Sequence, residues 1–328
     1  MTAPLRDGVG RSIEYLRISV TDRCNFRCLY CMPVEGLPWL ARDTLLSDDE
    51  LVDVVRELAP MGLRRIRITG GEPTLRPGLV SLIQRMRESA TLDDVSLSTN
   101  GVRLPAMARA LRDAGVDRVN ISVDSLSAER IHAIARRSLA FDPLTAIDAA
   151  LDAGFEPVKV NVVVLRGVND DEVASLAALT LERPVHVRFI ELMPVGDTLG
   201  AGPEHFIPAS EIAQRIEREH GTLVAAIAPR RGNGPARYQA IAGARGTIGF
   251  ITPMSHTYCA TCNRVRLTAD GRLRTCLFGD HEVDLRTPLR AGEPLAPYVH
   301  AALRDKPPAH ELLQLRTGGL VALSQTGG

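Results

Sequence analysis

Between residues 15 and about 195, six short β-rich segments alternate with amphipathic stretches, and this repeat constrains the fold more than any other feature. The six segments are 15–21, 64–70, 94–101, 118–125, 158–165 and 186–194. The helical stretch 47–62 carries its own end signals, because Ser47 and Glu50 can form a capping box and Gly62 follows the last turn. Six β-α repeats predict a parallel sheet, either open and doubly wound or curved into a barrel.

The strand segments alternate polar and apolar residues, whereas strands of parallel sheets are usually apolar on both faces. Successive side chains of a strand point to opposite faces, so one face is apolar and receives the helices. The other face carries Arg17, Arg67, Lys159 and Arg188. Val, Ile and Leu fill an ordinary barrel interior, so this lumen is predicted to hold a polar, anionic ligand. A sheet with one face in water is the alternative, and it is uncommon for β-α repeats.

After residue 220 the pattern changes to short strand-like runs at 223–228, 237–242 and 246–251. A cysteine-rich segment follows, and a helix is predicted near 294–304. The fold class is therefore α/β, a partial (βα)6 TIM-like barrel with a smaller C-terminal α+β domain. We place the two domains at residues 1–220 and 221–328.

Composition and charge exclude several classes of protein. The formal net charge of zero argues against a general nucleic-acid surface. No apolar run reaches membrane-spanning length and the N-terminus lacks a signal-peptide core, so we expect a cytoplasmic protein with no membrane partner. Arginine outnumbers lysine by 37 to two, and Lys159 and Lys306 indicate positions where arginine would not serve.

The six cysteines form two groups of three, which we call the first and the second triad. The first triad is Cys24, Cys28 and Cys31, spaced CxxxCxxC directly after the first strand segment; the second is Cys259, Cys262 and Cys276. In a reducing compartment, clustered cysteines indicate metal or cluster ligands. Four thiolates complete a [4Fe–4S] cluster, so three leave one iron open to a small molecule.

A structural zinc site is the alternative for both triads. A distant residue would complete the first site, and His256 would complete the second. Zinc sites more often use paired CxxC knuckles than the CxxxCxxC spacing of the first triad.

The first triad, with Tyr30 before its last cysteine, resembles the radical S-adenosylmethionine superfamily, as does the segment TGGEPTLRP at 69–77. The resemblance implies that the open iron binds the amino and carboxylate groups of S-adenosylmethionine and that reductive cleavage yields a 5′-deoxyadenosyl radical. Gly70 and Gly71 would let the backbone approach closely, and Glu72 could accept from the ammonium group.

The second triad refines the resemblance, because Arg264 and Arg266 alternate directly after Cys262. Such an arginine pair recognises carbonyl, phosphate or ring-edge acceptors. Over essentially the whole chain, the sequence closely resembles the GTP 3′,8-cyclase family of molybdenum cofactor biosynthesis. The matching segments are TDRCNFRCLYCMP, IRITGGEP, STNG, RVNISVDSL, VKVN, VRFIELMP, the second triad and the terminal Gly-Gly.

The resemblance implies a lyase with two [4Fe–4S] clusters, one for S-adenosylmethionine and one that holds the guanine of GTP. The radical would remove the ribose 3′ hydrogen, and the 3′ carbon would attack C8 to give (8S)-3′,8-cyclo-7,8-dihydroguanosine 5′-triphosphate. An electron donor and a downstream cyclic pyranopterin monophosphate synthase are the implied partners. A monomer or homodimer is expected.

The resemblance also assigns residues. It gives the two triads to the clusters and gives S-adenosylmethionine to Tyr30, Gly71, Ser122 and Met193. It gives GTP to Arg17, Arg67, Ser98, Lys159, Arg264, Val265 and Arg266, and the strand pattern adds Arg188. Ser98 replaces the usual threonine of the family and keeps the hydroxyl. The expected catalytic residues are Arg17, Arg264, Arg266, Gly327 and Gly328.

Three alternatives stay open. The Gly-Gly tail would enter the active site in the family, or it is a frayed end. The enzyme could be another radical S-adenosylmethionine protein with an auxiliary cluster that acts on a peptide, although such enzymes usually carry more C-terminal cysteines. A non-catalytic zinc-binding module is the third alternative.

Overall fold

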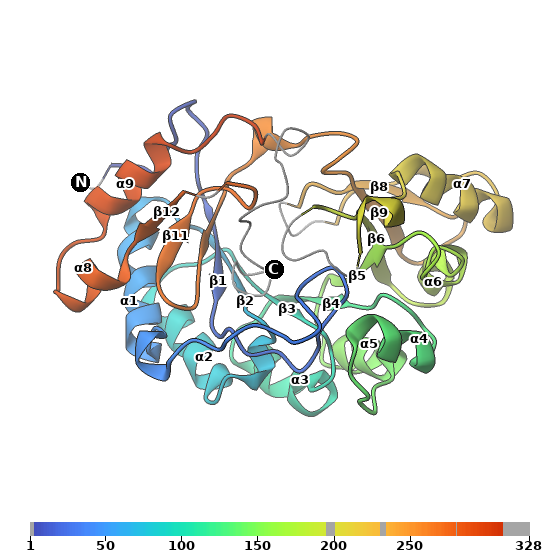
Figure 1. Ribbon diagram of the computed structural model, residues 1–328, viewed down its shortest axis with the longest axis horizontal. Helices are drawn as coiled ribbons and strands as arrows, with labels where there is room; N and C mark the ends of the chain where they lie inside the picture. Colours follow the sequence, from blue (N-terminus) through green and yellow to red (C-terminus); the bar gives the residue numbers. More distant parts are fainter. Residues whose placement is uncertain (1–2, 195–200, 230–233, 280, 311–328) are drawn as a thin grey trace.

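The computed structural model describes residues 3–194, 201–229, 234–279 and 281–310 (Figure 1). Gly327 and Gly328, which were predicted to be catalytic, lie outside the described residues. In the described ranges, no helix has the length and apolar character needed to cross a membrane.

The strands of the described residues form one sheet in the order β12-β11-β10-β1-β2-β3-β4-β5-β6-β9-β8-β7. Strands β10 to β9 in this order run parallel, and the strands outside them are antiparallel. The strands are β1 (Tyr15–Ser19), β2 (Arg65–Thr69), β3 (Asp94–Thr99), β4 (Arg118–Ser122), β5 (Val158–Val164), β6 (Val185–Glu191), β7 (Val224–Ala225), β8 (Arg237–Ala240), β9 (Thr247–Ile251), β10 (Arg264–Leu267), β11 (Arg272–Arg274) and β12 (Glu282–Asp284). The six predicted segments are β1 to β6, and the predicted fold class, a partial TIM-like barrel with a C-terminal extension, is confirmed.

Helices follow the strands as the repeat predicts. They are α1 (Asp48–Leu58), α2 (Leu79–Ser89), α3 (Leu104–Asp113), α4 (Ala128–Ala135), α5 (Pro143–Asp152), α6 (Val173–Glu182), α7 (Ala209–His220), α8 (Arg286–Arg290) and α9 (Ala296–Arg304). Single 3-10 turns are η1 (Arg42–Thr44), η2 (Ala59–Met61), η3 (Pro73–Leu75), η4 (Pro203–His205) and η5 (Cys259–Thr261). The capping box of Ser47 and Glu50 is present, and Gly62 adopts φ 108°.

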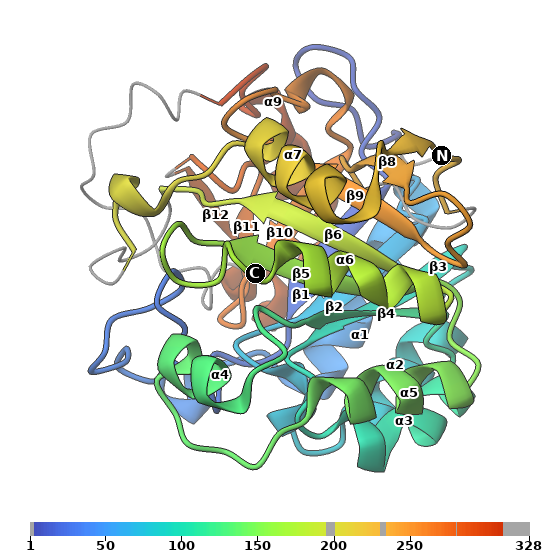
Figure 2. The same cartoon turned by 90° about the vertical axis from the view of Figure 1, so that its right-hand side faces the viewer.

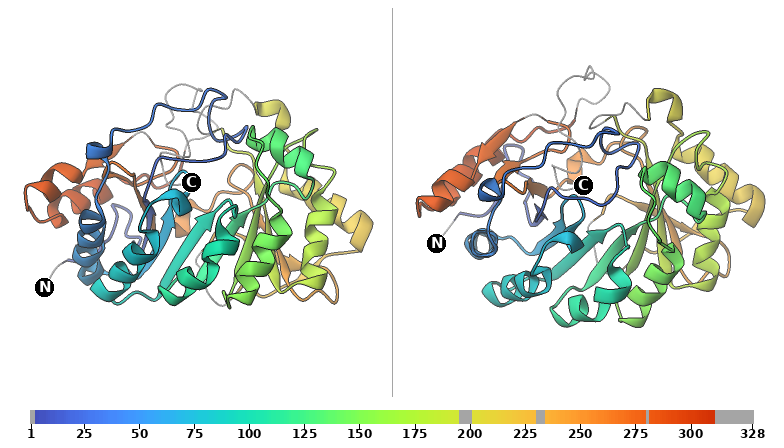
Figure 3. Two further views of the ribbon diagram at one scale, coloured as in Figure 1. Left: turned by 90° about the horizontal axis from the view of Figure 1, so that it is seen from below. Right: turned by 60° about the horizontal axis from the view of Figure 1, so that its bottom comes forward.

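The two faces of the sheet differ as the alternation predicts. Leu16, Ile66, Val95 and Val187 belong to one apolar core that the strands share with the helices. The helices cover the outer face of the curved sheet (Figure 3), and α6 and α7 lie over β6 and β9 (Figure 2). The polar side chains therefore face the lumen.

Strands β9 and β10 are consecutive in the chain but lie at opposite ends of the parallel strands, beside β6 and β1 respectively. The connection 252–263 must therefore cross the open side of the barrel, and Figure 1 shows this orange segment passing above the strands. It carries Cys259 and Cys262 of the second triad. Because β9 pairs with β6, the sheet continues past residue 220, and the division into two domains there stays a prediction.

Candidate active site

The lumen of the barrel holds a cavity of about 280 Å³. Side chains from all eight parallel strands line it, together with the first triad and Tyr258. Predicted site residues in its wall are Arg17, Cys24, Cys28, Tyr30, Cys31, Arg67, Gly71, Ser98, Ser122, Arg188, Met193, Arg264 and Arg266. The fold thus gathers residues that lie up to about 250 positions apart in the sequence into one wall.

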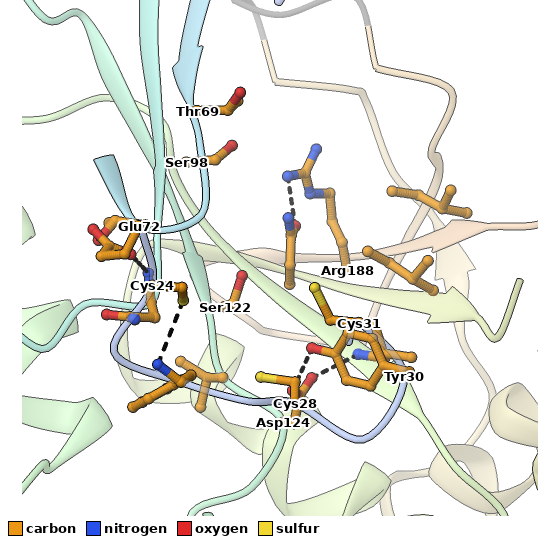
Figure 4. Close-up of a pocket in the computed structure, with 18 of the residues that line it drawn as sticks. Cys24, Cys28, Tyr30, Cys31, Thr69, Glu72, Ser98, Ser122, Asp124 and Arg188 are labelled. Carbon is orange, nitrogen blue, oxygen red and sulfur yellow. Dashed lines mark hydrogen bonds between the residues drawn. The ribbon is translucent and has the colours of Figure 1, made fainter. Parts of the chain in front are cut away.

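The first triad lies on the loop that follows β1, with Cys24, Cys28 and Cys31 in the wall of the cavity (Figure 4). The loop is folded by its own backbone, because the amide of Cys31 donates to the carbonyl of Cys28 at 2.9 Å. The amide of Phe26 donates to Cys24 Sγ at 3.4 Å. Burial raises the pKa of the Cys24 thiol to about 11 and that of Cys28 well above its usual value. Buried thiols of this kind ionise when they bind a cationic metal centre.

The GGE turn after β2 packs directly on the loop of the first triad. The amide of Gly71 donates to the carbonyl of Thr21 at 2.8 Å, and the amide of Glu72 donates to the carbonyl of Arg23 at 2.7 Å. A Cβ atom on Gly71 would lie 2.3 Å from the oxygen of Arg23, so only glycine allows this approach. The backbone of this turn therefore approaches closely, as predicted, and the described residue segment that it approaches is the cysteine loop.

Glu72 is buried, and protein groups already surround its carboxylate. Oε1 accepts from the hydroxyls of Thr74 at 2.6 Å and Thr99 at 2.7 Å, and Oε2 accepts from the amide of Asn100 at 2.7 Å. The side chain thereby ties the turn to the end of β3. Its expected contact with an ammonium group stays a prediction, whereas these hydrogen bonds show that Glu72 holds the turn.

Asp124 was not predicted as a site residue, yet it lines the cavity beside Cys28. Tyr30 Oη donates to Asp124 Oδ2 at 2.6 Å, and the amide of Val163 donates to Oδ1 at 2.9 Å (Figure 4). Burial raises the pKa of Asp124 to about 6, and the hydrogen bond from Tyr30 offsets part of that rise. The sequence could have indicated Asp124, because it lies two positions after Ser122 and so continues the alternation of polar residues in the segment 118–125.

Three arginines form a row across adjacent strands of the lumen. In the register of the parallel ladders, Arg17 on β1 stands between Arg266 on β10 and Arg67 on β2. Burial and the neighbouring charges of Arg266 and Arg67 hold the pKa of Arg17 well below its usual range. Burial likewise lowers the pKa of Arg67 and of Arg266 to about 10. An anionic ligand would relieve this repulsion, which supports the predicted anion-binding lumen.

Arg188 completes the cationic wall from β6. Its Nη2 donates to Asn120 Oδ1 at 2.7 Å and to Asn161 Oδ1 at 2.5 Å, so two side-chain amides fix the guanidinium. Neither asparagine was predicted as a site residue.

Lys159 is 2% exposed. It stands two residues before Asn161 on β5, toward the amino end of the strand, and outside the described wall of the cavity. Burial, and then the charges of Arg188 and Arg118, lowers the pKa of Lys159 to about 5. Arg118 is itself paired with Asp94 through two hydrogen bonds of 2.8 and 2.7 Å.

The second triad lines a smaller cavity of about 60 Å³. This cavity shares Tyr258, Arg264 and Arg266 with the larger one. Burial raises the pKa of Cys262, but the charges of Lys306 and Arg264 outweigh burial, and the pKa falls to about 7. The side chain of Val265 packs in the apolar core, so its predicted contact with GTP would fall to its backbone.

No His, Cys, Asp or Glu side chains of the described ranges converge in groups of three or more that could hold a metal ion. His256 does not line the cavity of the second triad in the described residues. Metal analysis of the purified protein would decide between a zinc site and an iron–sulfur cluster at each triad.

Glu191 at the end of β6 is a second site residue that the sequence did not reveal. Its Oε2 accepts from the amides of Ser255 at 2.9 Å and Met254 at 3.1 Å, and Oε1 accepts from the amide of Ala209 at 3.0 Å. The carboxylate thus anchors the segment before the second triad to the barrel. No local pattern marks such a role, because its partners lie 18 to 64 residues away.

Family models match two parts of the chain. The model described as Radical SAM superfamily matches residues 18–180, and that described as Molybdenum Cofactor Synthesis C matches residues 185–312. A GTP 3′,8-cyclase of Pelotomaculum thermopropionicum is 47% identical over 94% of this chain and 96% of its own length. The chain belongs to the GTP 3′,8-cyclase family. A GTP 3′,8-cyclase of Heliobacterium modesticaldum is also 47% identical, over 98% of this chain and 99% of its own length.

Solved structures support the fold of this GTP 3′,8-cyclase family member. Streptococcus suis SuiB bound to the precursor peptide SuiA superposes with a TM-score of 0.60 at 12% identity, covering 96% of this chain and 68% of that chain. SuiB bound to S-adenosylmethionine gives the same TM-score at 14% identity, covering 93% and 68%. At this identity the likeness concerns the fold alone.

Membership in the radical S-adenosylmethionine superfamily implies one [4Fe–4S] cluster and S-adenosylmethionine. The first triad fits this requirement, because it supplies three half-buried thiols at the edge of a cavity and a glycine turn is packed against their loop.

Proposed function

We propose that this protein is a lyase that converts GTP and S-adenosylmethionine into (8S)-3′,8-cyclo-7,8-dihydroguanosine 5′-triphosphate, an early step of molybdenum cofactor biosynthesis. One observation carries the proposal: the cavity of the first triad and the cavity of the second triad meet at Tyr258, Arg264 and Arg266. A substrate in the lumen can therefore touch both.

The first triad is proposed to hold the cluster that binds S-adenosylmethionine. When bound, this pair supplies a 5′-deoxyadenosyl radical after one-electron reduction. Tyr30, Gly71, Ser122 and Met193 are the proposed contacts of S-adenosylmethionine, and all of them line the main cavity. Asp124 holds the Tyr30 hydroxyl and so orients the cysteine loop.

The arginine row is proposed to bind the triphosphate. Arg17, Arg67 and Arg266 project from three adjacent strands, and Arg188 faces them from β6. Ser98 would add a hydroxyl donor to this wall, and Lys159 would act from beneath it. Arginine presents paired donors to phosphate oxygens, and low dielectric strengthens each contact.

The second triad is proposed to hold a second [4Fe–4S] cluster whose open iron meets the guanine base. Arg264 and Arg266 lie between this triad and the main cavity, where they would orient the nucleoside between the two clusters. The backbone of Val265 and the catalytic tail residues Gly327 and Gly328 remain part of the proposal. Holding the ribose near one cluster and the base near the other is a task of positioning.

Further parts of the proposal concern the cell. A cytoplasmic location, an electron donor, a downstream cyclic pyranopterin monophosphate synthase and a monomeric or homodimeric state are expected from the family.

The test uses the whole chain, reconstituted anaerobically with iron and sulfide. Iron is counted first, and 5′-deoxyadenosine is then followed after addition of dithionite and S-adenosylmethionine, with GTP, with ATP or with neither. About eight irons per chain and formation of 5′-deoxyadenosine stimulated by GTP but not by ATP are expected. A GTP-derived product that releases a pterin after acid oxidation would identify the cyclisation.

Other results would contradict specific parts of the proposal. Zinc in place of iron, with no cleavage of S-adenosylmethionine, would show that both triads are structural zinc sites. Cleavage indifferent to GTP but stimulated by a peptide would favour the peptide-modifying alternative.

A further inference from the structure

Lys306, one of the chain's two lysines, follows α9 and is 4% exposed. The proposed function gives it no role. Lysine side chains are rarely buried unless the ammonium group has partners.

The Lys306 ammonium group has three such partners in the surroundings of the second triad. Nζ donates to Cys262 Sγ at 3.6 Å and to the carbonyl of Arg264 at 3.1 Å. It also donates to the carbonyl of Thr275, the residue before Cys276. An ammonium group carries three donors, so these contacts use its full capacity and join Cys262 to the segment that leads into Cys276.

The geometry explains why lysine stands here in an arginine-rich chain. The three acceptors surround one point, which suits a compact ammonium group, whereas a guanidinium group spreads five donors over a plane. Arg11 also ties the segment of Lys306 to the second triad. Its guanidinium donates to the carbonyl of Cys259 at 2.7 Å and to the carbonyl of Pro307, the residue after Lys306, at 2.7 Å. Lys306 therefore meets Cys262 on a rigid support.

We propose that Lys306 is a positioning residue of the second triad that donates an N–H bond to the Cys262 sulfur and raises the reduction potential of the cluster bound there. The inference rests on the second cluster of the proposed function. Thiolate-ligated clusters become more negative on reduction, and a buried cation that donates to a ligand sulfur stabilises the reduced form.

The test compares Lys306→Met with Lys306→Arg in the whole reconstituted chain without GTP. Midpoint potentials are measured by redox titration with electron paramagnetic resonance, and a variant with Cys24, Cys28 and Cys31 replaced by Ala assigns the signal of the second triad. Lys306→Met should shift that potential to more negative values, while Lys306→Arg should stay closer to the parent. Loss of iron from the second triad to a chelator should be about 10-fold faster in Lys306→Met.

Lys159→Met is the matched control, because Lys159 is also buried but lies on β5, outside the described lining of the second triad's cavity. It should leave the potential of the second cluster unchanged. If Lys306 only fills space, the potential of Lys306→Met should lie closer to the parent than that of Lys306→Arg, because Met has a volume similar to that of Lys and Arg does not.

An unchanged potential and unchanged iron loss in Lys306→Met, with about eight irons per chain, would overturn the role of Lys306 alone. A parent protein with only about four irons would instead overturn the second cluster of the proposed function, and this role with it.

Discussion

Arg17 on β1 and Arg266 on β10 occupy the same register position of two parallel strands, and both side chains line the cavity. Neighbouring strands lie about 4.8 Å apart, so two cations separated by 249 residues in the sequence stand side by side. Burial lowers the pKa of both guanidinium groups, and the charge of Arg266 lowers that of Arg17 further. The arrangement costs free energy in the ligand-free protein, and an anion offsets that cost.

The first prediction concerns this row. Arg17→Ala should raise the dissociation constant of GTP about 10- to 100-fold, because one charge-assisted contact to phosphate contributes about 1.5–3 kcal/mol. Iron content should not change. The control is Arg65→Ala, since Arg65 pairs with Glu14 at 2.8 Å at the amino end of β2. Equal GTP affinity in Arg17→Ala and the parent, by anaerobic calorimetry, would refute the anion-binding lumen.

The second prediction concerns the pH dependence of stability through Lys159. The folded pKa of about 5 lies below the ordinary value of 10.5, so between these values the unfolded chain binds a proton that the folded chain does not. This term therefore makes the protein more stable as pH rises, by at most about 1.4 kcal/mol per pH unit. Lys159→Met removes the term, so its stability relative to the parent should be greatest at low pH and shrink toward pH 10.

Chemical denaturation at pH 6, 7.5 and 9 measures this difference. A gap between Lys159→Met and the parent that is constant across the three pH values would show that Lys159 is charged in the folded protein.

The third prediction concerns the hydrogen bond from Tyr30 to Asp124. Tyr30→Phe leaves the buried carboxylate without this donor, so the cysteine loop should lose its fixed position while keeping its three thiols. We expect normal iron content and a KM for S-adenosylmethionine about 10-fold higher. Tyr298→Phe is the matched control, because Tyr298 Oη donates to Glu293 at the same 2.6 Å in a hydrogen bond that is exposed to solvent. A KM that changes equally in both variants would contradict the positioning role.

The fourth prediction separates two buried carboxylates. Glu191→Gln replaces an acceptor that holds the amides of Met254 and Ser255, so iron bound to the second triad should fall while the first triad keeps its iron. Glu72→Gln should weaken binding of S-adenosylmethionine instead, since Glu72 holds the GGE turn. Iron counts and S-adenosylmethionine binding would measure both effects. The same defect in both variants would mean that general destabilisation is the cause.

Much of the fold could be predicted because its signals are local. The period-two alternation of β1 to β6 fixed which side chains face the lumen, and the capping box fixed the start of α1. The spacing of the cysteines indicated the two triads. Each of these features depends on residues within about twenty positions of one another.

The sequence alone therefore determined the six strands β1 to β6, the polar face and the two cysteine groups. The tertiary structure decided how these are arranged, because the link between β9 and β10 crosses the open barrel and the cavities of the two triads share Tyr258, Arg264 and Arg266. It also decided the roles of Asp124, Glu191 and Lys306, whose partners are distant in the chain. The physical reason is that strand register and burial set these contacts, and neither is encoded in a short segment.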